Sequence, residues 1–239
     1  MQRVRIASWN IRKAVGLDWR RDPERVLRVL ERIQPDIVLL QESDKRLPPR
    51  PPALPLDLVR HAGWTAIDAD PNTPSIGHHG NAILLGPDFQ LETFRALDLP
   101  GLEPRGAVLA KVTSPGISLT LGALHLGLRR RDRLAQMAHV LDVAHQFDGP
   151  IVLGGDLNEW RKTKTLLPPG SNWTDIAPGP SFHASAPRFC LDRFLINETV
   201  TIGSHGVLSR QSAERASDHL PIWIDIELPR NGVGDIWNR

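Results

Sequence analysis

The chain contains no tyrosine and only one cysteine, Cys190, among its 239 residues. A single cysteine excludes an internal disulfide and a cysteine-rich zinc module, and the lack of tyrosine excludes any mechanism that uses a phenol. There is no run of about 18 apolar residues that would span a membrane, and the first residues lack the apolar core of a secretory signal. We therefore expect a cytoplasmic protein that makes no stable insertion into membranes.

An excess of charge of one sign is also absent. Lys and Arg number 29 against 27 for Asp and Glu, so the formal net charge is +2. A net charge this small neither requires nor excludes a polyanionic partner. Hydrophobic residues make up 41% of the chain and charged residues 23%, which is typical of a folded globular protein and excludes extensive disorder.

The chain length suits one large domain or two small ones. Two proline-rich stretches, Arg46–Asp57 and Pro168–Pro187, are expected to be surface loops because proline disrupts regular structure. The strand pattern continues across both of them. We therefore predict a single domain over residues 1–239, with a core from about 3 to 228 and a polar tail at 229–239.

Short apolar or alternating segments recur along the chain and predict strands. Between some of them lie helical patterns. The first helix begins at Asp22-Pro23, a favourable cap followed by a favourable first residue, and ends at Pro35. The predicted strands are Val4–Trp9, Asp36–Gln41, Thr65–Ala69, Asn81–Leu85, Ala107–Thr113, Ser118–Leu124, Ile151–Gly154, Arg193–Ile196 and Ile222–Glu227.

Apolar residues at helical spacing mark the buried face of each predicted helix. In the first helix they are Val26, Leu27, Leu30 and Ile33. A second helix is predicted over Arg131–Phe147, with Leu134, Met137, Ala138, Leu141 and Ala144 on its buried face. Strands outnumber helices, and helices separate some of the strands, which indicates mixed sheets covered by helices in a layered α/β sandwich.

Acids, amides and histidines stand at the ends of several predicted strands. Ligands of α/β proteins bind at such strand ends. Each residue also has a structural explanation, because Asn10 is a common turn former, a glutamate such as Glu42 is commonly solvated, and a lone His125 is commonly a buried structural residue. The residues in question are Asn10, Glu42, His125, Asp156, Asn158, Asp192, Asp218 and His219.

Seven short motifs containing these residues resemble the endonuclease/exonuclease/phosphatase superfamily, in the order in which that family carries them. They are SWNIR (8–12), DIVLLQE (36–42), GNAIL (80–84), ALHL (123–126), GGDLN (154–158), LDRF (191–194) and SDHLP (217–221). The resemblance implies a four-layer α/β/β/α sandwich of two mixed sheets flanked by helices. It also implies hydrolysis of a phosphoester by water, assisted by Mg²⁺ or Mn²⁺.

The resemblance implies a role for each matching residue. Glu42 and Asp218 match metal ligands, and Asn10 completes that site directly or through water. Asp156 and Asn158 match the pair that positions the attacking water and the phosphate. His219 matches a general base or phosphate-orienting group that Asp192 orients, and His125 matches a general acid or stabiliser of the transition state. Hard divalent cations prefer such oxygen ligands.

Four further residues are expected to contact the substrate phosphate. Asn81 and Arg105 match family positions near the middle strands, and Arg12 and Arg193 add guanidinium groups that can pair with phosphate oxygens. The apurinic-site branch of the family has an acid at the position of Arg12 and a tyrosine at that of Arg193. Both arginines are more similar to those of the pancreatic-type deoxyribonucleases.

The sequence pattern fits more than one substrate. A phosphodiesterase or nuclease is the leading hypothesis, and a phosphomonoesterase or a hydrolase of phospholipid or inositol-phosphate head groups is the alternative. A catalytically silent binding protein with the same fold is the second alternative. The Arg129–Arg133 cluster is either a solvated helix start or an anion-binding rim, and Trp19 and Trp160 are candidates for stacking on bases. The expected partner is a phosphoester, with nucleic acid one candidate, and no obligate protein partner is indicated.

Overall fold

The computed structural model describes residues 1–44, 49–161, 164–213 and 215–229, so most of the predicted polar tail lies outside the described residues. The described strands form two mixed sheets, each with six strands. The first sheet has the order β11 (Thr201–Val207), β12 (Ile222–Leu228), β1 (Gln2–Asn10), β2 (Ile37–Gln41), β4 (Ala82–Leu85), β3 (Thr65–Ala66). The second has the order β5 (Gln90–Leu99), β6 (Arg105–Ser114), β7 (Ile117–His125), β8 (Ile151–Asp156), β10 (Asp192–Asn197), β9 (Trp173–Ile176).

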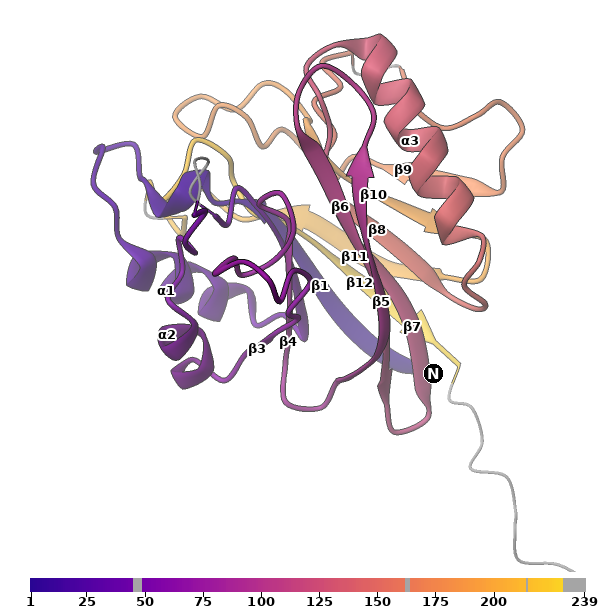
Figure 1. Cartoon of the computed structure of the whole chain (residues 1–239), viewed down its shortest axis with the longest axis horizontal. Coiled ribbons are helices and arrows are strands. Elements are labelled where there is room, and N and C mark those ends of the chain that lie inside the picture. Colours follow the sequence, from indigo (N-terminus) through magenta and orange to yellow (C-terminus); the bar gives the residue numbers. More distant parts are fainter. Residues whose placement is uncertain (45–48, 162–163, 214, 230–239) are drawn as a thin grey trace, which may run out of the picture.

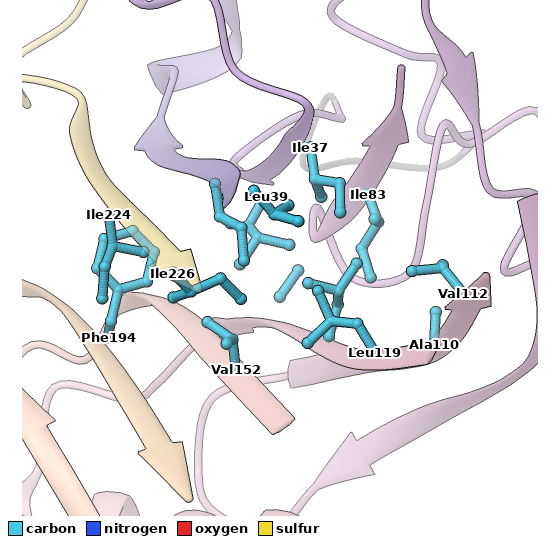
Figure 2. Packing of buried hydrophobic residues seen from close by; sticks show 14 of the residues in the cluster. Ile37, Leu39, Ile83, Ala110, Val112, Leu119, Val152, Phe194, Ile224 and Ile226 are labelled. Atoms are coloured by element: carbon cyan, nitrogen blue, oxygen red, sulfur yellow. The ribbon is translucent and has the colours of Figure 1, made fainter. Parts of the chain in front are cut away.

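The two sheets pack face to face and bury the central core between them (Figure 2). Strand residues alternate between this core and the outer faces, as the period of two requires. In β2, Ile37 and Leu39 point to the central core, whereas Val38 and Leu40 belong to an outer core beneath the helices. Gly154 of β8 permits this close approach, because a Cβ atom there would lie 2.8 Å from Phe194 and 2.9 Å from Leu39.

Helices cover both outer faces (Figure 1). Helices α1 (Pro23–Ile33) and α2 (Leu56–His61) pack on the first sheet, and α3 (Arg130–Ala144) packs on the second. This arrangement is the predicted four-layer sandwich. Helix α1 is capped as predicted, since the Asp22 carboxylate accepts a hydrogen bond from the Arg25 backbone nitrogen at 2.8 Å. Its predicted apolar face is fully buried.

The predicted buried face of α3 is partly wrong. Leu134 is 43% exposed and Ala138 is also exposed, whereas Arg133 and Gln136 are buried. The helix is rotated because the Arg133 guanidinium pairs with Glu159 at 3.3 Å and donates to the carbonyl oxygens of Gly127 and Leu128. A polar anchor thus decides the orientation of this helix.

Three strands were not anticipated, and all three lie at sheet edges. They are β5, β9 and β11, and β9 lies inside the proline-rich stretch that was predicted to be a loop. Most residues of β5 and β11 are exposed or half-buried, so these strands lack the apolar runs that mark a central strand. Helix α2 likewise begins at Leu56, inside the first predicted loop.

Candidate active site

The predicted site residues come from strand ends that meet at one edge of the sandwich. In the second sheet His125 pairs in register with Asp156 across the parallel strands β7 and β8, and Asp156 pairs with Asp192 across β8 and β10. In the first sheet Asn10 pairs with Gln41, which places Glu42 directly beyond the end of β2. Strand register therefore aligns these polar side chains.

One carboxylate oxygen, Oδ2 of Asp156, lies at the centre of the cluster. Asn10 Nδ2 donates to it at 3.1 Å, His125 Nε2 lies 3.5 Å from it, and His219 Nε2 lies 3.7 Å from it. Asn10 comes from the first sheet and Asp156 from the second. The Asn10–Asp156 hydrogen bond therefore joins the two sheets at the site, and both side chains are buried.

Oxygen ligands suited to a hard cation gather around Asn10. Its Nδ2 also lies 3.5 Å from Glu42 Oε1, so Glu42 and Asp156 approach the same amide. Glu42 has a left-handed backbone with φ of 50°, an uncommon conformation for a residue with a side chain. Carboxylate oxygens are donors that Mg²⁺ and Mn²⁺ prefer, so Glu42 and Asp156 fit the predicted metal. The Asn10 amide faces these carboxylates with its nitrogen, and its Oδ1 accepts a hydrogen bond from the Arg12 backbone nitrogen at 3.1 Å.

Lys13 is a site residue that the sequence analysis missed. Its ammonium group pairs with Glu42, and both residues line the same cavity. Burial alone raises the pKa of Glu42, but the charges of His125 and Lys13 outweigh burial and lower it to about 2. Glu42 is therefore an anion near neutral pH, which a metal ligand must be. The signal was present in the sequence, because Lys13 directly follows the SWNIR motif.

Asp218 lies on the other side of the site, beside Arg12. Arg12 Nε is 3.6 Å from Asp218 Oδ2, and its guanidinium carbon lies 4.5 Å from the centre of the Trp19 ring. Trp19 is 78% exposed, so this stacked pair stands at the surface of the site. Arg12 covers one face of the Trp19 ring, and the predicted contacts of these two residues with substrate stay predictions.

Buried hydrogen bonds fix the loop that carries Asp218 and His219. Trp9, a fully buried core residue, donates from Nε1 to the carbonyl oxygen of His219 at 2.9 Å. Ser217 Oγ donates to the carbonyl oxygen of Asn10 at 2.7 Å, and the His219 backbone nitrogen donates to Ser217 Oγ at 3.2 Å. The loop is therefore held against the end of β1.

His219 lies between two carboxylates. Its Nδ1 lies 2.8 Å from Asp192 Oδ2, and Ser181 Oγ contacts the same oxygen. Burial lowers the pKa of His219, but the charges of Asp192 and Asp156 outweigh burial and raise it to about 10. In this arrangement His219 is an imidazolium near neutral pH, with a proton on each nitrogen. Ser181 is a second residue that the sequence analysis missed.

His125, unlike His219, is neutral near pH 7. Arg105 Nη1 lies 2.8 Å from His125 Nε2 and can only donate, so this nitrogen is the acceptor. Burial and the charge of Arg105 together outweigh the opposing charge of Asp156 and lower the pKa of His125 to about 4. Glu103 holds Arg105 from the other side, with its Oε2 at 2.7 Å from Nη2 and 3.1 Å from Nε.

Asn158 lies beside Asp156, as the motif predicts. Its backbone nitrogen donates to Asp156 Oδ1 at 3.0 Å, and its Nδ2 donates to the Leu126 carbonyl oxygen at 2.9 Å. The second bond ties the GGDLN segment to the residue that follows His125. Asn158 is therefore positioned by both middle strands of the second sheet.

Two predicted phosphate ligands lie differently from the rest. Asn81 is fully buried, and its Nδ2 donates to the Gly106 carbonyl oxygen at 2.8 Å, which joins the two sheets. Arg193 is 4% exposed and pairs with Asp175 at 2.9 Å. Alternate strand residues face opposite sides, so Arg193 points away from the face that holds Asp192. Its predicted contact with substrate phosphate is not available in this arrangement.

The arginine cluster before α3 also has internal partners. Arg130 pairs with Glu159 at 2.6 Å, and the buried Arg133 pairs with the same carboxylate. This favours the structural alternative for these two arginines.

Trp160 is 43% exposed and packs against Phe182 and Phe189, and the Phe182 ring lies 4.8 Å from the ring of His219.

A cavity of about 420 Å³ opens beside the cluster, and Glu42 and His125 form part of its wall. The wall carries both signs of charge and some apolar surface. Its further lining residues are Lys13, Asp44, Arg50, His79, Gly80, Glu103, Pro104, Arg105 and Leu128. Such a volume is typical of a small-molecule site.

Among the described residues, no helix has the length and apolar character needed to cross a membrane.

Comparison with known proteins shows the family to which the chain belongs. The uncharacterized protein YbhP of Escherichia coli is 29% identical over 163 residues, a match that spans 64% of each chain. An endonuclease/exonuclease/phosphatase from Beutenbergia cavernae has a similar structure, with a TM-score of 0.71, 22% identity, and coverage of 95% of this chain and 72% of that one. TDP2 of D. rerio, complexed with a single-strand DNA product, gives a TM-score of 0.68 and 17% identity, with coverage of 95% and 100%.

The two structures share the layered arrangement of this chain, and at these identities the similarity establishes the fold. The match to YbhP covers 64% of the length of that protein, which is less than two thirds. The family model for the Endonuclease/Exonuclease/phosphatase family matches residues 7–219, a span that contains every residue of the cluster. The chain therefore belongs to the Endonuclease/Exonuclease/phosphatase family, whose members are metal-dependent phosphoesterases and nucleases.

Proposed function

We propose that this protein is a Mg²⁺-dependent phosphodiesterase that hydrolyses its substrate by attack of water on phosphorus. The observation that carries the proposal is the position of Asp156 Oδ2, which lies within 3.7 Å of Asn10, His125 and His219. A carboxylate, two histidines and the Asn10 amide thus meet at one point. Mn²⁺ is an alternative cation, because it accepts the same ligands.

Glu42, Asn10 and Asp218 would hold the cation, with Asp156 at its edge. When bound, the cation neutralises phosphate charge and stabilises the leaving oxygen. Asp156 and Asn158 are assigned to positioning the attacking water, since the Asp156 carboxylate is an acceptor at the centre of the cluster. The Asn158 hydrogen bond to Asp156 keeps that carboxylate in place.

His219 is assigned to orienting the phosphate. With a raised pKa it carries a proton on Nε2, and this N–H donates a hydrogen bond to a phosphoryl oxygen. Asp192 fixes the ring through Nδ1 and balances its charge. A role as general base requires that this proton first leave, so the raised pKa favours the phosphate-orienting alternative of the two that the family resemblance implies.

Arg105 and His125 are assigned to the opposite side of the phosphate. The Nε2 lone pair of His125 accepts a hydrogen bond from Arg105, and its lowered pKa keeps it neutral near pH 7. A neutral imidazole with this nitrogen occupied has no proton there to give to a leaving group. His125 therefore holds Arg105, and Arg105 stabilises charge on the phosphate as it reacts.

Hydrolysis of bis(p-nitrophenyl) phosphate and of nicked DNA, measured with and without Mg²⁺, tests the proposal. We expect Mg²⁺-dependent release of product, and we expect His219→Ala to lower the rate by about 100-fold or more. Asp156→Asn should lower it at least as much. Equal rates in the His219→Ala variant, or undiminished activity in EDTA, would contradict the proposal.

The cavity favours a second candidate, a small phosphoester in place of a long nucleic acid. Its volume of about 420 Å³ and its cationic residues Lys13, Arg50 and Arg105 suit a nucleotide or an inositol phosphate. Nucleic acid is supported by the similarity to TDP2, whose structure contains a single-strand DNA product. A panel of DNA, RNA, nucleotides, inositol phosphates and phospholipid head groups separates the two. A protein that binds neither Mg²⁺ nor Mn²⁺ in calorimetry would instead be a silent binding protein.

A further inference from the structure

Two adjacent histidines and an aspartate meet outside the catalytic cluster. His78 Nε2 lies 2.9 Å from Asp98 Oδ1, and His79 Nε2 lies 3.0 Å from the same oxygen. The ligand atoms of the three residues lie within 4.8 Å of one another. The histidines belong to the loop before β4, and Asp98 belongs to the edge strand β5, so the group joins the two sheets.

The local backbone places the two rings side by side. His78 and Asn81 exchange backbone hydrogen bonds at 2.8 and 2.9 Å, which closes a tight turn. His79 within this turn has a left-handed φ of 48°, which costs free energy for a residue with a side chain. Asp98 pairs in register with Gly106, where a Cβ atom would lie 2.9 Å from the His78 ring and 3.0 Å from the His79 ring. The glycine thus leaves the space that the two imidazoles occupy.

We propose that His78, His79 and Asp98 bind a zinc ion at a site distinct from the catalytic one, and that this ion fixes the loop before β4 to the edge of the second sheet. Two imidazole nitrogens and one carboxylate are a common zinc ligand set, with water in the fourth position. The oxygen-rich cluster around Glu42 suits Mg²⁺ instead. The chain therefore offers two sites that select different metals.

The distances suit zinc after a small adjustment. Tetrahedral zinc with bonds of about 2.0–2.1 Å places neighbouring ligand atoms roughly 3.3 Å apart. The two observed N–O distances are a few tenths of an ångström shorter. The Asp98 side chain is 82% exposed, so it can turn outward to admit the ion and a water.

Arg50 provides a specific check on the site. Its Nη1 lies 3.3 Å from His79 Nδ1 and must be the donor, which leaves the proton of the neutral ring on Nε2. Zinc on Nε2 requires that proton on Nδ1, so zinc binding and the Arg50 hydrogen bond exclude each other. Removing the arginine should therefore strengthen zinc binding. Arg50 and His79 both line the cavity. A zinc ion on His79 would therefore release Arg50 to turn into the cavity.

Calorimetry on the metal-stripped full chain tests the proposal without any measurement of activity. The Glu42→Gln, Asp156→Asn double variant removes two carboxylates of the catalytic site, and we expect it to keep one equivalent of zinc. Adding His78→Gln or Asp98→Asn should weaken zinc binding at least about tenfold. Adding Arg50→Ala should strengthen it. His61→Gln, which changes an exposed histidine on α2, is the matched control and should leave zinc affinity unchanged.

The proposal fails if the double variant takes up no zinc, or if His78→Gln and Asp98→Asn bind zinc as tightly as their parent. It also fails if excess Mg²⁺ displaces the zinc, because that places zinc at oxygen ligands. Far-UV circular dichroism checks that each variant is folded, and Asp98→Asn keeps the size of the side chain. A zinc anomalous signal between the two imidazoles in a crystal would locate the ion. These results do not depend on the proposed phosphodiesterase activity.

Discussion

Asp192 Oδ2 lies 2.8 Å from His219 Nδ1, although 27 residues separate the two in the chain. Asp192 is fully buried, and the same oxygen is contacted by Ser181 Oγ. A buried carboxylate in this position selects the histidine tautomer and balances the charge of its protonated form. The pair therefore sets the orientation in which His219 meets a substrate.

The Asp192→Asn variant should lose this control. The amide keeps the size of the side chain but removes the charge that keeps His219 protonated. We expect kcat to fall by about 100-fold while KM changes little, because ring orientation matters most in the transition state. Steady-state kinetics with bis(p-nitrophenyl) phosphate and Mg²⁺ measure both parameters. Asp175→Asn is the matched control, since Asp175 pairs with Arg193 away from the cluster, and its kcat should remain within about twofold.

The two predicted phosphate arginines of the second sheet should behave differently. Arg105→Gln removes the guanidinium beside His125, and we expect kcat/KM to fall by about 100-fold with little loss of stability. Arg193→Gln breaks a buried ion pair, and we expect it to lower the free energy of unfolding by about 3 kcal/mol. Urea denaturation and kinetics on the folded fraction distinguish them. A large loss of kcat in a stable Arg193→Gln variant would overturn the structural assignment.

Metal binding should stabilise the protein in a manner that depends on Glu42. A ligand that binds only the native state at 100 times its Kd adds about 2.7 kcal/mol to the free energy of unfolding. We expect saturating Mg²⁺ to raise the melting temperature and EDTA to reverse the increase. Glu42→Gln should abolish both responses because it removes an anionic ligand. An equal Mg²⁺ response in this variant would exclude Glu42 as a ligand.

Acid stability should depend on Asp225, which links strands β1 and β12. Burial raises its pKa, but hydrogen bonds from Arg5, Ser204 and Arg3 outweigh burial and lower it from 3.8 to about 2. A lowered pKa means that the stabilisation is fully present above about pH 4 and is lost as the pH falls toward 2. The difference corresponds to about 2 kcal/mol. Asp225→Asn should remove this part of the pH dependence, measured as urea unfolding at pH 7 and pH 3.

The close packing of the sheets predicts a large effect at Gly154. An added Cβ atom would lie 2.8 Å from the Phe194 ring and 2.9 Å from Leu39, both in the central core. We expect Gly154→Ala to lower the free energy of unfolding by about 1–3 kcal/mol, as overpacking does. Gly203→Ala is the control, because its Cβ atom would meet nothing closer than 3.4 Å. Thermal and urea unfolding of both variants give the comparison.

The central strands and the first helix were predictable from the sequence, whereas the edges were not. Segments such as Ile37–Gln41 are buried on both faces and are continuously apolar, so the pattern is unambiguous. The edge strand β5 reads QLETFRALDL and is mostly exposed. Its backbone partners, which only the folded sheet supplies, make it a strand. The same reason explains why Trp173–Ile176 was predicted to be part of a loop.

Most of the motif residues lie together in the folded chain, because polar side chains directly after central strands gather at one sheet edge. Their individual contacts were not predictable. Lys13 and Ser181 lie against motif residues through the approach of separate loops. Asp44, Arg50 and His79, which complete the cavity wall, come from segments with no strand-end signal.

The sequence by itself determined the family, the layered sandwich and the clustering of acids, amides and histidines. Each of these depends on short motifs and on local patterns of apolar and polar residues. Only the tertiary structure decided how those residues divide their work. Strand register aligned His125, Asp156 and Asp192, and the pleat turned Arg193 to the opposite face. Burial between charged neighbours left His125 neutral and made His219 a cation. Facing, burial and neighbouring charge are properties of the folded packing, so no local pattern contains them.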